Sequence, residues 1–180
     1  MIVVVDTNVA VVANGRSEQA SADCERMCGQ RLQKITKGPD RLVLDDQRRI
    51  IREYQNNLRS EGQPGIGDAF LKWVLTNWRN PKQCQLVTIT QVGGNETDFR
   101  GLPSHPALQG FDPSDRKFVA VALAHSQRPP ILQAVDSKWW DMQEALECNN
   151  VQVEFLCPYD MQRLQTSHKG KRQRRTRRRT

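Results

Sequence analysis

The 180-residue sequence has no long hydrophobic run, and it is poor in aromatic residues and histidine. None of its apolar runs approaches the roughly 18 residues of a membrane-spanning helix, so we expect no membrane partner. The first apolar run follows no basic segment and ends in Asp6, which is not typical of a signal peptide. Together with a mean hydropathy of −0.69, this composition predicts a soluble, cytoplasmic protein.

Several common catalytic and binding motifs are also missing. The chain has no G-x-x-x-x-G-K-[ST] phosphate-binding loop and no G-x-G-x-x-G after its first apolar run. A dehalogenase-type phosphatase needs a second acid two residues after Asp6, but Asn8 stands there. The three histidines, His105, His125 and His168, have no matching serine or cysteine for nucleophilic catalysis. These absences argue against four classes of protein: P-loop nucleotide-binding proteins, dinucleotide-binding proteins, dehalogenase-type phosphatases, and serine or cysteine hydrolases.

The cysteines do not form the pattern of a disulfide-rich protein. There are five, at Cys24, Cys28, Cys84, Cys148 and Cys157, whereas secreted disulfide frameworks usually have an even and denser set. Cys24 and Cys28 lie one turn apart on a predicted helix, but no second pair and no nearby histidine completes a zinc site. We therefore expect reduced thiols.

What the sequence does contain is a regular alternation of strand and helix patterns. Residues 2–5 form a continuous apolar run, which is typical of a strand buried on both faces. Further strands are predicted at 41–44, 85–90, 131–135 and 151–156, the last of them at an edge of the sheet. Helices are predicted at 9–13, 17–37, 46–60, 68–78, 116–126 and 138–148, with a long loop at 91–111. This order predicts an α/β fold, a three-layer α/β/α sandwich with a central parallel sheet.

The net charge of +7 is concentrated at the C-terminal end. We predict one domain at residues 1–160 and a basic, disordered tail at 161–180. Between positions 169 and 179 of that tail there are eight basic residues and no acid: Lys169, Lys171, Arg172, Arg174, Arg175, Arg177, Arg178 and Arg179. The rest of the chain therefore carries a net charge of about −1. Such a run binds nucleic-acid phosphates without sequence preference, and this is the partner we favour. A solvated tail without a dedicated partner, or attraction to a membrane surface, are the alternatives.

Four acids are placed where they could form one site. Asp6 and Asp136 each follow a predicted strand, and open α/β sheets bind ligands at the carboxyl ends of their strands. If those two strands are neighbours, Asp115 at a helix start and Glu53 on another helix can join them. Converging carboxylates repel one another unless a cation neutralises them, and oxygen ligands favour Mg²⁺ or Mn²⁺ over zinc. Such an ion lowers the pKa of a bound water for attack on a phosphodiester.

Each of these acids also has a structural interpretation, which the sequence leaves open. Asp6 and Asp136 can cap the helices that follow them, and Asp115 belongs to a capping pattern. Glu53 can form an ordinary ion pair with Arg49, four residues earlier. It is the shared position of Asp6 and Asp136 at strand ends that favours a site.

The order of these motifs resembles that of the PIN-domain nucleases. Residues 3–9, an apolar strand followed by Asp-Thr-Asn, resemble the opening of that family, with Asp6 as its first acid. Glu53 resembles the helical glutamate that follows the second strand. Asp115 before an alanine-rich helix and Asp136 after a strand resemble the two later acids. The resemblance in order and spacing covers about residues 1–156.

The resemblance implies a PIN-like sandwich with Rossmann-like topology and metal-dependent cleavage of RNA, less often of DNA. The four acids would hold Mg²⁺ or Mn²⁺, and Thr7 and Asn8 would assist through hydrogen bonds to a ligand or water. The chain departs from the family pattern at one position. Where the family often has another acid two residues after Asp136, Lys138 stands here, which leaves the number of ions open. Asp141 is a candidate substitute.

We therefore expect a metal-dependent endoribonuclease whose basic tail binds RNA. The alternatives are a PIN-like module that binds RNA or a protein without turnover, and a nuclease that cleaves DNA. Because many members of the family are toxins of bacterial toxin–antitoxin pairs, an antitoxin-like protein partner is a further expectation.

Overall fold

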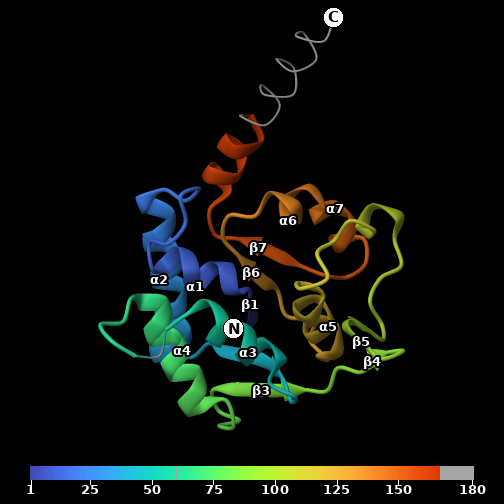
Figure 1. The fold of residues 1–180 in the computed structure, drawn as a ribbon, viewed down its shortest axis with the longest axis horizontal. Helices are drawn as coiled ribbons and strands as arrows, with labels where there is room; N and C mark the ends of the chain where they lie inside the picture. Colours follow the sequence, from blue (N-terminus) through green and yellow to red (C-terminus); the bar gives the residue numbers. More distant parts are fainter. Residues whose placement is uncertain (60, 167–180) are drawn as a thin grey trace, which may run out of the picture.

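The computed structural model describes residues 1–59 and 61–166, and its central feature is a five-stranded parallel sheet (Figure 1). The strand order is β3-β2-β1-β6-β7. The strands are β1 (Ile2–Val5), β2 (Arg41–Asp45), β3 (Cys84–Val87), β6 (Ile131–Gln133) and β7 (Val153–Phe155). The continuous apolar run at 2–5 accordingly forms the middle strand, whose residues Val3, Val4 and Val5 are fully buried.

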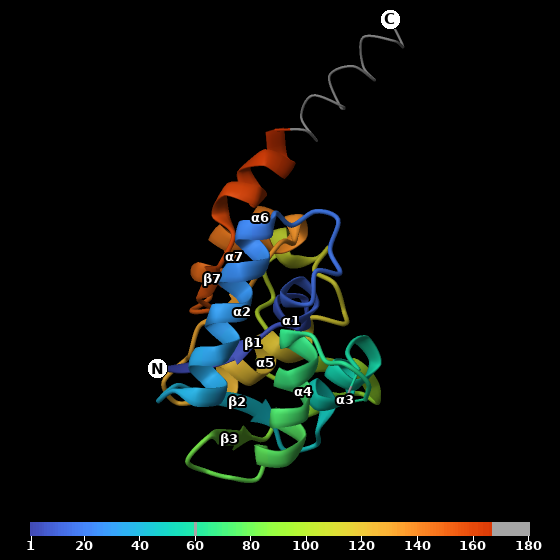
Figure 2. The ribbon, with the colours of Figure 1, turned by 90° about the vertical axis from the view of Figure 1, so that its left-hand side faces the viewer.

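Helices cover both faces of this sheet, which confirms the predicted three-layer α/β/α sandwich. The helices are α1 (Thr7–Ala13), α2 (Ala22–Lys37), α3 (Arg49–Asn57), α4 (Ile66–Asn77), α5 (Arg116–Ala124), α6 (Ser137–Asp141) and α7 (Gln143–Glu147). Helices α2 and α4 pack together on one side, and α5 lies on the other side of the strands (Figures 1 and 2). The glycine at position 67 allows α4 to approach α1, because a Cβ there would lie 2.0 Å from the Ala10 carbonyl oxygen.

The predicted loop at 91–111 contains regular structure that the sequence pattern did not indicate. A hairpin of β4 (Gln91–Val92) and β5 (Asn95–Phe99) turns at two glycines with positive φ, and a 3₁₀ helix, η1 (Pro106–Leu108), follows. Most of β5 is polar and only partly buried, so it lacks the apolar alternation by which strands are recognised. The predicted helix at 138–148 is divided into α6 and α7.

A helix at residues 158–166, which we call the C-terminal helix, was not predicted either. It crosses the predicted domain boundary at 160 and buries Met161 completely, while Gln165 Nε2 donates to Asp141 Oδ1 at 3.0 Å. The eight basic residues of the predicted tail lie outside the described residues. Among the described helices, none is both long and apolar enough to cross a membrane.

Candidate acidic site

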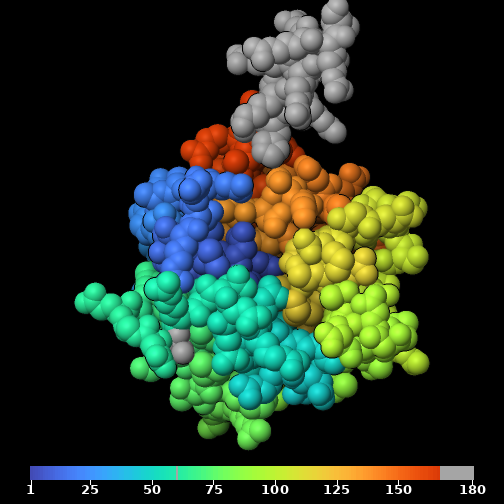
Figure 3. All heavy atoms as spheres, viewed as in Figure 1, coloured from blue at the N-terminus to red at the C-terminus, as the bar shows by residue number. Residues whose placement is uncertain are grey.

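The strand order places two of the predicted acids at one edge of the sheet. From β1 the chain proceeds to β2 and β3 on one side, and β6 and β7 lie on the other, so the order reverses between β1 and β6. Parallel pairing of Val5 with Leu132 brings the carboxyl ends of β1 and β6 together, where Asp6 and Asp136 follow. This reversal point is where open α/β sheets bind ligands. In the space-filling view, the start of the chain reaches the surface here, between α3, the loop before α5, and α6 (Figure 3).

Asp6 is both a helix cap and a member of a group of like charges. Its Oδ1 accepts a hydrogen bond from the Asn8 amide at 2.8 Å, which caps α1. The side chain is buried, and burial raises its pKa well above the ordinary value. The charge of Asp115 raises the pKa further, and Glu53 and Asp136 add to it, against the opposing Asn8 hydrogen bond. The capping interpretation is therefore correct, but it does not account for the acidic surroundings.

Glu53 contacts residues of two other helices, α1 and α5. Its Oε1 accepts a hydrogen bond from Thr7 Oγ1 at 3.1 Å, and its Oε2 forms an ion pair with Lys117 on the first turn of α5. The alternative ion pair with Arg49 is not formed. Arg49 lies 3.6 Å from Asp45 instead, a buried carboxylate that also caps α3. Lys117 is thus a cation of the site that the sequence did not indicate.

Asp115 does not use its side chain to cap α5. Its Oδ2 accepts a hydrogen bond from Trp139 Nε1 at 3.0 Å, and Oδ1 accepts one from Ser114 Oγ at 3.3 Å. Burial raises the pKa of Asp115 to about 6, opposed by the Trp139 hydrogen bond and supported by the charges of Asp112 and Asp136. The Asp115 side chain therefore contacts Trp139 and Ser114 and does not cap α5.

Asp136 caps α6, because its Oδ1 accepts hydrogen bonds from the amides of Lys138 and Trp139 at 2.8 and 3.4 Å. A fifth acid lies nearby that was not among the predicted ligands. Asp112 Oδ1 accepts hydrogen bonds from Ser114, and its Oδ2 lies 3.1 Å from Lys138 Nζ. These Ser114 hydrogen bonds, with the Lys138 contact, hold the pKa of Asp112 below its ordinary range. Lys138, which stands where PIN-domain nucleases often have an acid, thus neutralises Asp112.

Thr7 and Asn8 act within the protein. The Thr7 hydroxyl donates to Glu53, as described above. The Asn8 side chain makes two hydrogen bonds to one backbone unit: its Nδ2 donates to the Val135 carbonyl at 3.0 Å, and its Oδ1 accepts from the Val135 amide at 3.1 Å. Both side chains therefore position the acids. Asp141, the candidate substitute ligand, contacts the C-terminal helix and is not among the charges that shift the pKa of Asp6.

The four acids influence one another electrostatically, but their carboxylate oxygens do not surround a single point. Direct binding of one ion needs ligand atoms that lie close together. Among the described residues, the carboxylate oxygens of the four acids do not all lie within 4.8 Å of one another, whereas the sulfur atoms of three cysteines do. Each acid instead faces its own donor: an amide for Asp6 and Asp136, Lys117 for Glu53, and an indole for Asp115. The donor type fits Mg²⁺ or Mn²⁺, and the spacing is wider than direct ligation by all four acids requires.

A hollow of about 490 Å³ adjoins the acids without including any of the four. It is lined by the β4–β5 hairpin, the loop after it and the start of α5, with Asp98 and Arg116 forming an ion pair of 3.8 Å at its wall. Phe111, also in the wall, packs edge-to-face on Trp139 at 4.8 Å between ring centres. Trp139 also donates to Asp115, so it links Phe111 in the wall of the hollow to one of the acids.

The fold and these acids define an α/β/α protein with an acidic site at the reversal point of its sheet. No protein-family model, curated protein or solved structure matches the chain. The resemblance to PIN-domain nucleases therefore rests on the sequence motifs alone.

Proposed function

We propose that the protein is a metal-dependent endoribonuclease of the PIN type. The observation that carries the proposal is electrostatic: Glu53, Asp115 and Asp136 each raise the pKa of Asp6 at the carboxyl end of β1. A protein gains nothing in stability from such mutual repulsion, whereas a divalent cation would relieve it. These four residues would hold Mg²⁺ or Mn²⁺.

Some residues of the site would bind the ion, and others position the carboxylates. A bound Mg²⁺ or Mn²⁺ would supply an activated water and shield the charge of a phosphodiester. Trp139 and the Asn8 amide fix the carboxylates of Asp115 and Asp6 in direction. Lys117 places an ammonium group beside Glu53, so an approaching polyanion meets one fixed positive charge among the acids.

The basic residues at 169–179 would supply the affinity for RNA that an acidic site lacks, because the remainder of the chain is nearly neutral. Deleting residues 168–180 should weaken RNA binding and flatten its dependence on salt, as measured by fluorescence anisotropy between 50 and about 200 mM salt. An unchanged salt slope would show that the affinity has another source.

Cleavage assays test the catalytic proposal directly. Purified protein is incubated with labelled single-stranded and structured RNA and DNA, with Mn²⁺ and with EDTA. We expect Mn²⁺-dependent RNA cleavage that falls at least about 100-fold in Asp6→Asn and is unchanged in Asp141→Asn, an exposed acid outside the group. Equal cleavage by wild type and Asp6→Asn would contradict the proposal, and cleavage of DNA alone would reassign the substrate.

The second candidate is a PIN-like module that binds RNA or a protein partner without turnover. The ion pairs of Lys117 with Glu53 and of Lys138 with Asp112 favour it, because both neutralise acids of the site. A Mn²⁺ titration followed by thermal unfolding separates the two candidates. The nuclease should be stabilised by the ion, and the module should not respond.

Two further parts of the proposal have separate support: the composition supports a cytoplasmic location, and the family resemblance supports an antitoxin-like partner. A pull-down from the native cells against an Asp6→Asn bait would identify such a partner.

A further inference from the structure

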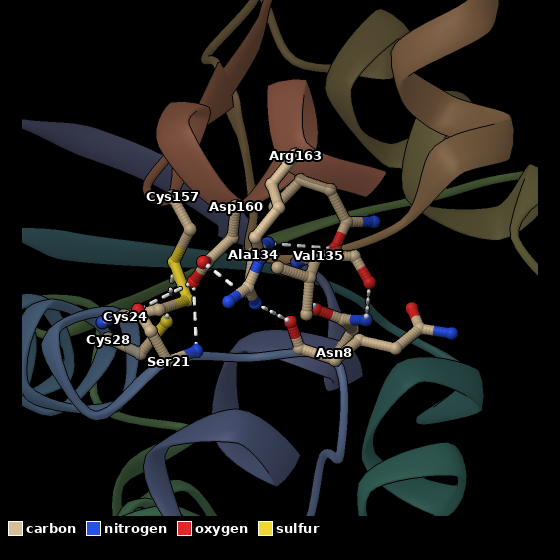
Figure 4. Close-up of a disulfide and its surroundings, with 11 residues drawn as sticks. Asn8, Ser21, Cys24, Cys28, Ala134, Val135, Cys157, Asp160 and Arg163 are labelled. Carbon is tan, nitrogen blue, oxygen red and sulfur yellow. Dashed lines mark hydrogen bonds and ion pairs between the residues drawn. A yellow bond between two sulfur atoms is a disulfide. The ribbon is translucent and has the colours of Figure 1, made fainter. Parts of the chain in front are cut away.

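Two cysteines of α2, Cys24 and Cys28, meet Cys157, which is far from them in the sequence. Cys24 and Cys157 form a disulfide with a Cα–Cα distance of 5.3 Å, and the Sγ of Cys28 lies 3.9 Å from that of Cys157 (Figure 4). All three are buried, with 3% exposure or less. The prediction of reduced thiols is therefore wrong for Cys24 and Cys157, because a pairing across 133 residues leaves no local signal in the sequence.

We propose that these residues form a thiol–disulfide site in which Cys157 can pair with either Cys24 or Cys28, and in which the bond controls how firmly the C-terminal helix is held on α2. Cys24 and Cys28 are four residues apart on α2, so they project from consecutive turns of the same helix face. Cys157 lies directly before the C-terminal helix and faces both. The site is independent of the proposed nuclease function.

The disulfide lies beside the polar contacts that dock the C-terminal helix. Asp160 Oδ2, one turn after Cys157, accepts hydrogen bonds from the Ser21 amide and hydroxyl at 2.9 and 2.7 Å. Arg163 donates to the Gln19 carbonyl at 3.1 Å. These contacts all join the helix to the segment that leads into α2, whose cap is Ser21. A bond from Cys157 to either α2 cysteine would therefore restrain the same docked arrangement.

The site lies at the same edge of the sheet as the acids. Leu156, just before Cys157, donates its amide to the Gln133 carbonyl at the end of β6. Figure 4 shows the disulfide in the same region as the hydrogen-bonded Asn8 and Val135. Val135 directly precedes Asp136 in the chain. A change at the cysteines thus occurs next to the strand that carries one of the acids.

The chemistry requires a two-electron oxidant, for which a low-molecular-weight disulfide such as glutathione disulfide suffices. The Cys157 thiolate attacks one sulfur of that disulfide, and a mixed disulfide forms as one glutathione leaves and takes up a proton. The thiolate of Cys24 or Cys28 then attacks the Cys157 sulfur, which releases the second glutathione thiol. Burial raises the pKa of Cys28 to about 12, so only a small fraction of Cys28 is thiolate at neutral pH and its pairing with Cys157 is slow.

Disulfide mapping of the full chain tests the choice of partner. In glutathione-disulfide buffer, mass spectrometry should find Cys24–Cys157 in wild type and in Cys28→Ser, and Cys28–Cys157 in Cys24→Ser. Cys148→Ser, which removes an exposed free cysteine, is the control and should leave the wild-type bond unchanged. A free Cys157 in oxidised wild type, or in oxidised Cys24→Ser, overturns the proposal.

Limited proteolysis tests the consequence in wild type, with Cys157→Ser as the control. Trypsin should cleave wild type after Arg163 about tenfold faster in reduced than in oxidised glutathione, because the C-terminal helix loses its covalent restraint. In Cys157→Ser the rate should be fast in both buffers. Equal rates for oxidised and reduced wild type would show that the bond does not hold the helix.

A metal centre is the competing outcome, because the three sulfur atoms lie within 4.8 Å of one another. Structural zinc sites have four protein ligands, and the described chain adds no fourth ligand atom to this group. The reduced protein is mixed with Zn²⁺ and passed through a desalting column. Retention of one equivalent, with all three thiols protected from iodoacetamide, overturns the redox site, and loss of the Zn²⁺ supports it.

Discussion

Two buried aspartates, Asp6 and Asp68, differ in what surrounds them. They are 5% and 2% exposed, and burial alone would raise the pKa of both. At Asp68, hydrogen bonds from the Arg59 amide and the Asn14 side chain, with the charge of Arg16 at 2.9 Å, outweigh burial and hold the pKa below its ordinary value. Asp68 joins α4 to the end of α1, which makes it a structural residue.

Asp6 has one hydrogen-bond donor, the Asn8 amide, and its remaining neighbours in the pKa balance are acids. A carboxylate that stabilises a fold is surrounded by donors and cations. One that is surrounded by like charges reduces stability at neutral pH, so a role in folding does not account for its surroundings. The comparison can be tested by substituting each aspartate and measuring the free energy of unfolding.

The largest effect on stability is expected at Asp68. Replacing it with alanine should lower the free energy of unfolding by about 3 kcal/mol, because several donors lose a buried acceptor. Asp6→Asn should leave that energy unchanged or raise it by about 1 kcal/mol at pH 7.5, since asparagine keeps the cap and removes the repulsion. Urea unfolding measures both. A loss in Asp6→Asn as large as in Asp68→Ala would make Asp6 structural as well.

The next effect is a dependence on pH with opposite signs in the two regions. The folded-state pKa of Asp115 is about 6, above its unfolded value, so the charged carboxylate costs stability at high pH, and this cost is lost as the pH falls from about 6 to about 3.9. Asp68, with its lowered pKa, contributes stability above its unfolded pKa of about 3.9 that is lost as the pH falls through its folded value.

Urea unfolding at pH 7.5 and 4.5 checks the sign at Asp115. Wild type should gain stability relative to Asp115→Asn as the pH falls, by about 2 kcal/mol. The same change with pH in both proteins would show that Asp115 is not perturbed.

A smaller effect is expected where the structure positions the acids. Asn8→Ala should cost about 1.5 kcal/mol, because the Val135 amide and carbonyl lose both partners. Asn57→Ala removes an exposed hydrogen bond to a helix carbonyl and serves as the control, with an expected change below about 0.5 kcal/mol. If both variants lose the same stability, the Asn8 pair has no special role.

The smallest effect concerns the cation of the site. Lys117→Met should raise the affinity for Mn²⁺ about fivefold in calorimetric titration, because Glu53 is freed and the site becomes more negative. Lys72→Met changes an exposed lysine on α4 and should leave the affinity unchanged. A weaker affinity in Lys117→Met would mean that Lys117 supports the ion.

The parts of the molecule that follow local rules could be predicted from the sequence. Continuous apolar runs gave the strands of the parallel sheet, and the carboxylates after β1 and β6 indicated the edge at which Asp6 and Asp136 meet. The ion pair of Lys117 with Glu53 could not be predicted, because it depends on how α5 packs against α3. The Cys24–Cys157 pairing is equally non-local. The β4–β5 hairpin was missed because its strands are short and polar.

The Asn8 side chain has a consequence for the precision of the site. Its amide offers Val135 the donor and acceptor pair that a neighbouring strand would offer, at the point where the backbone of β1 has already turned into α1. The ladder between β1 and β6 is thereby extended by one rung made from a side chain. Asp6 and Asp136, on either side of that rung, keep a common register, so substitutions deep in the core will change the stability of the protein before they change the spacing of this pair.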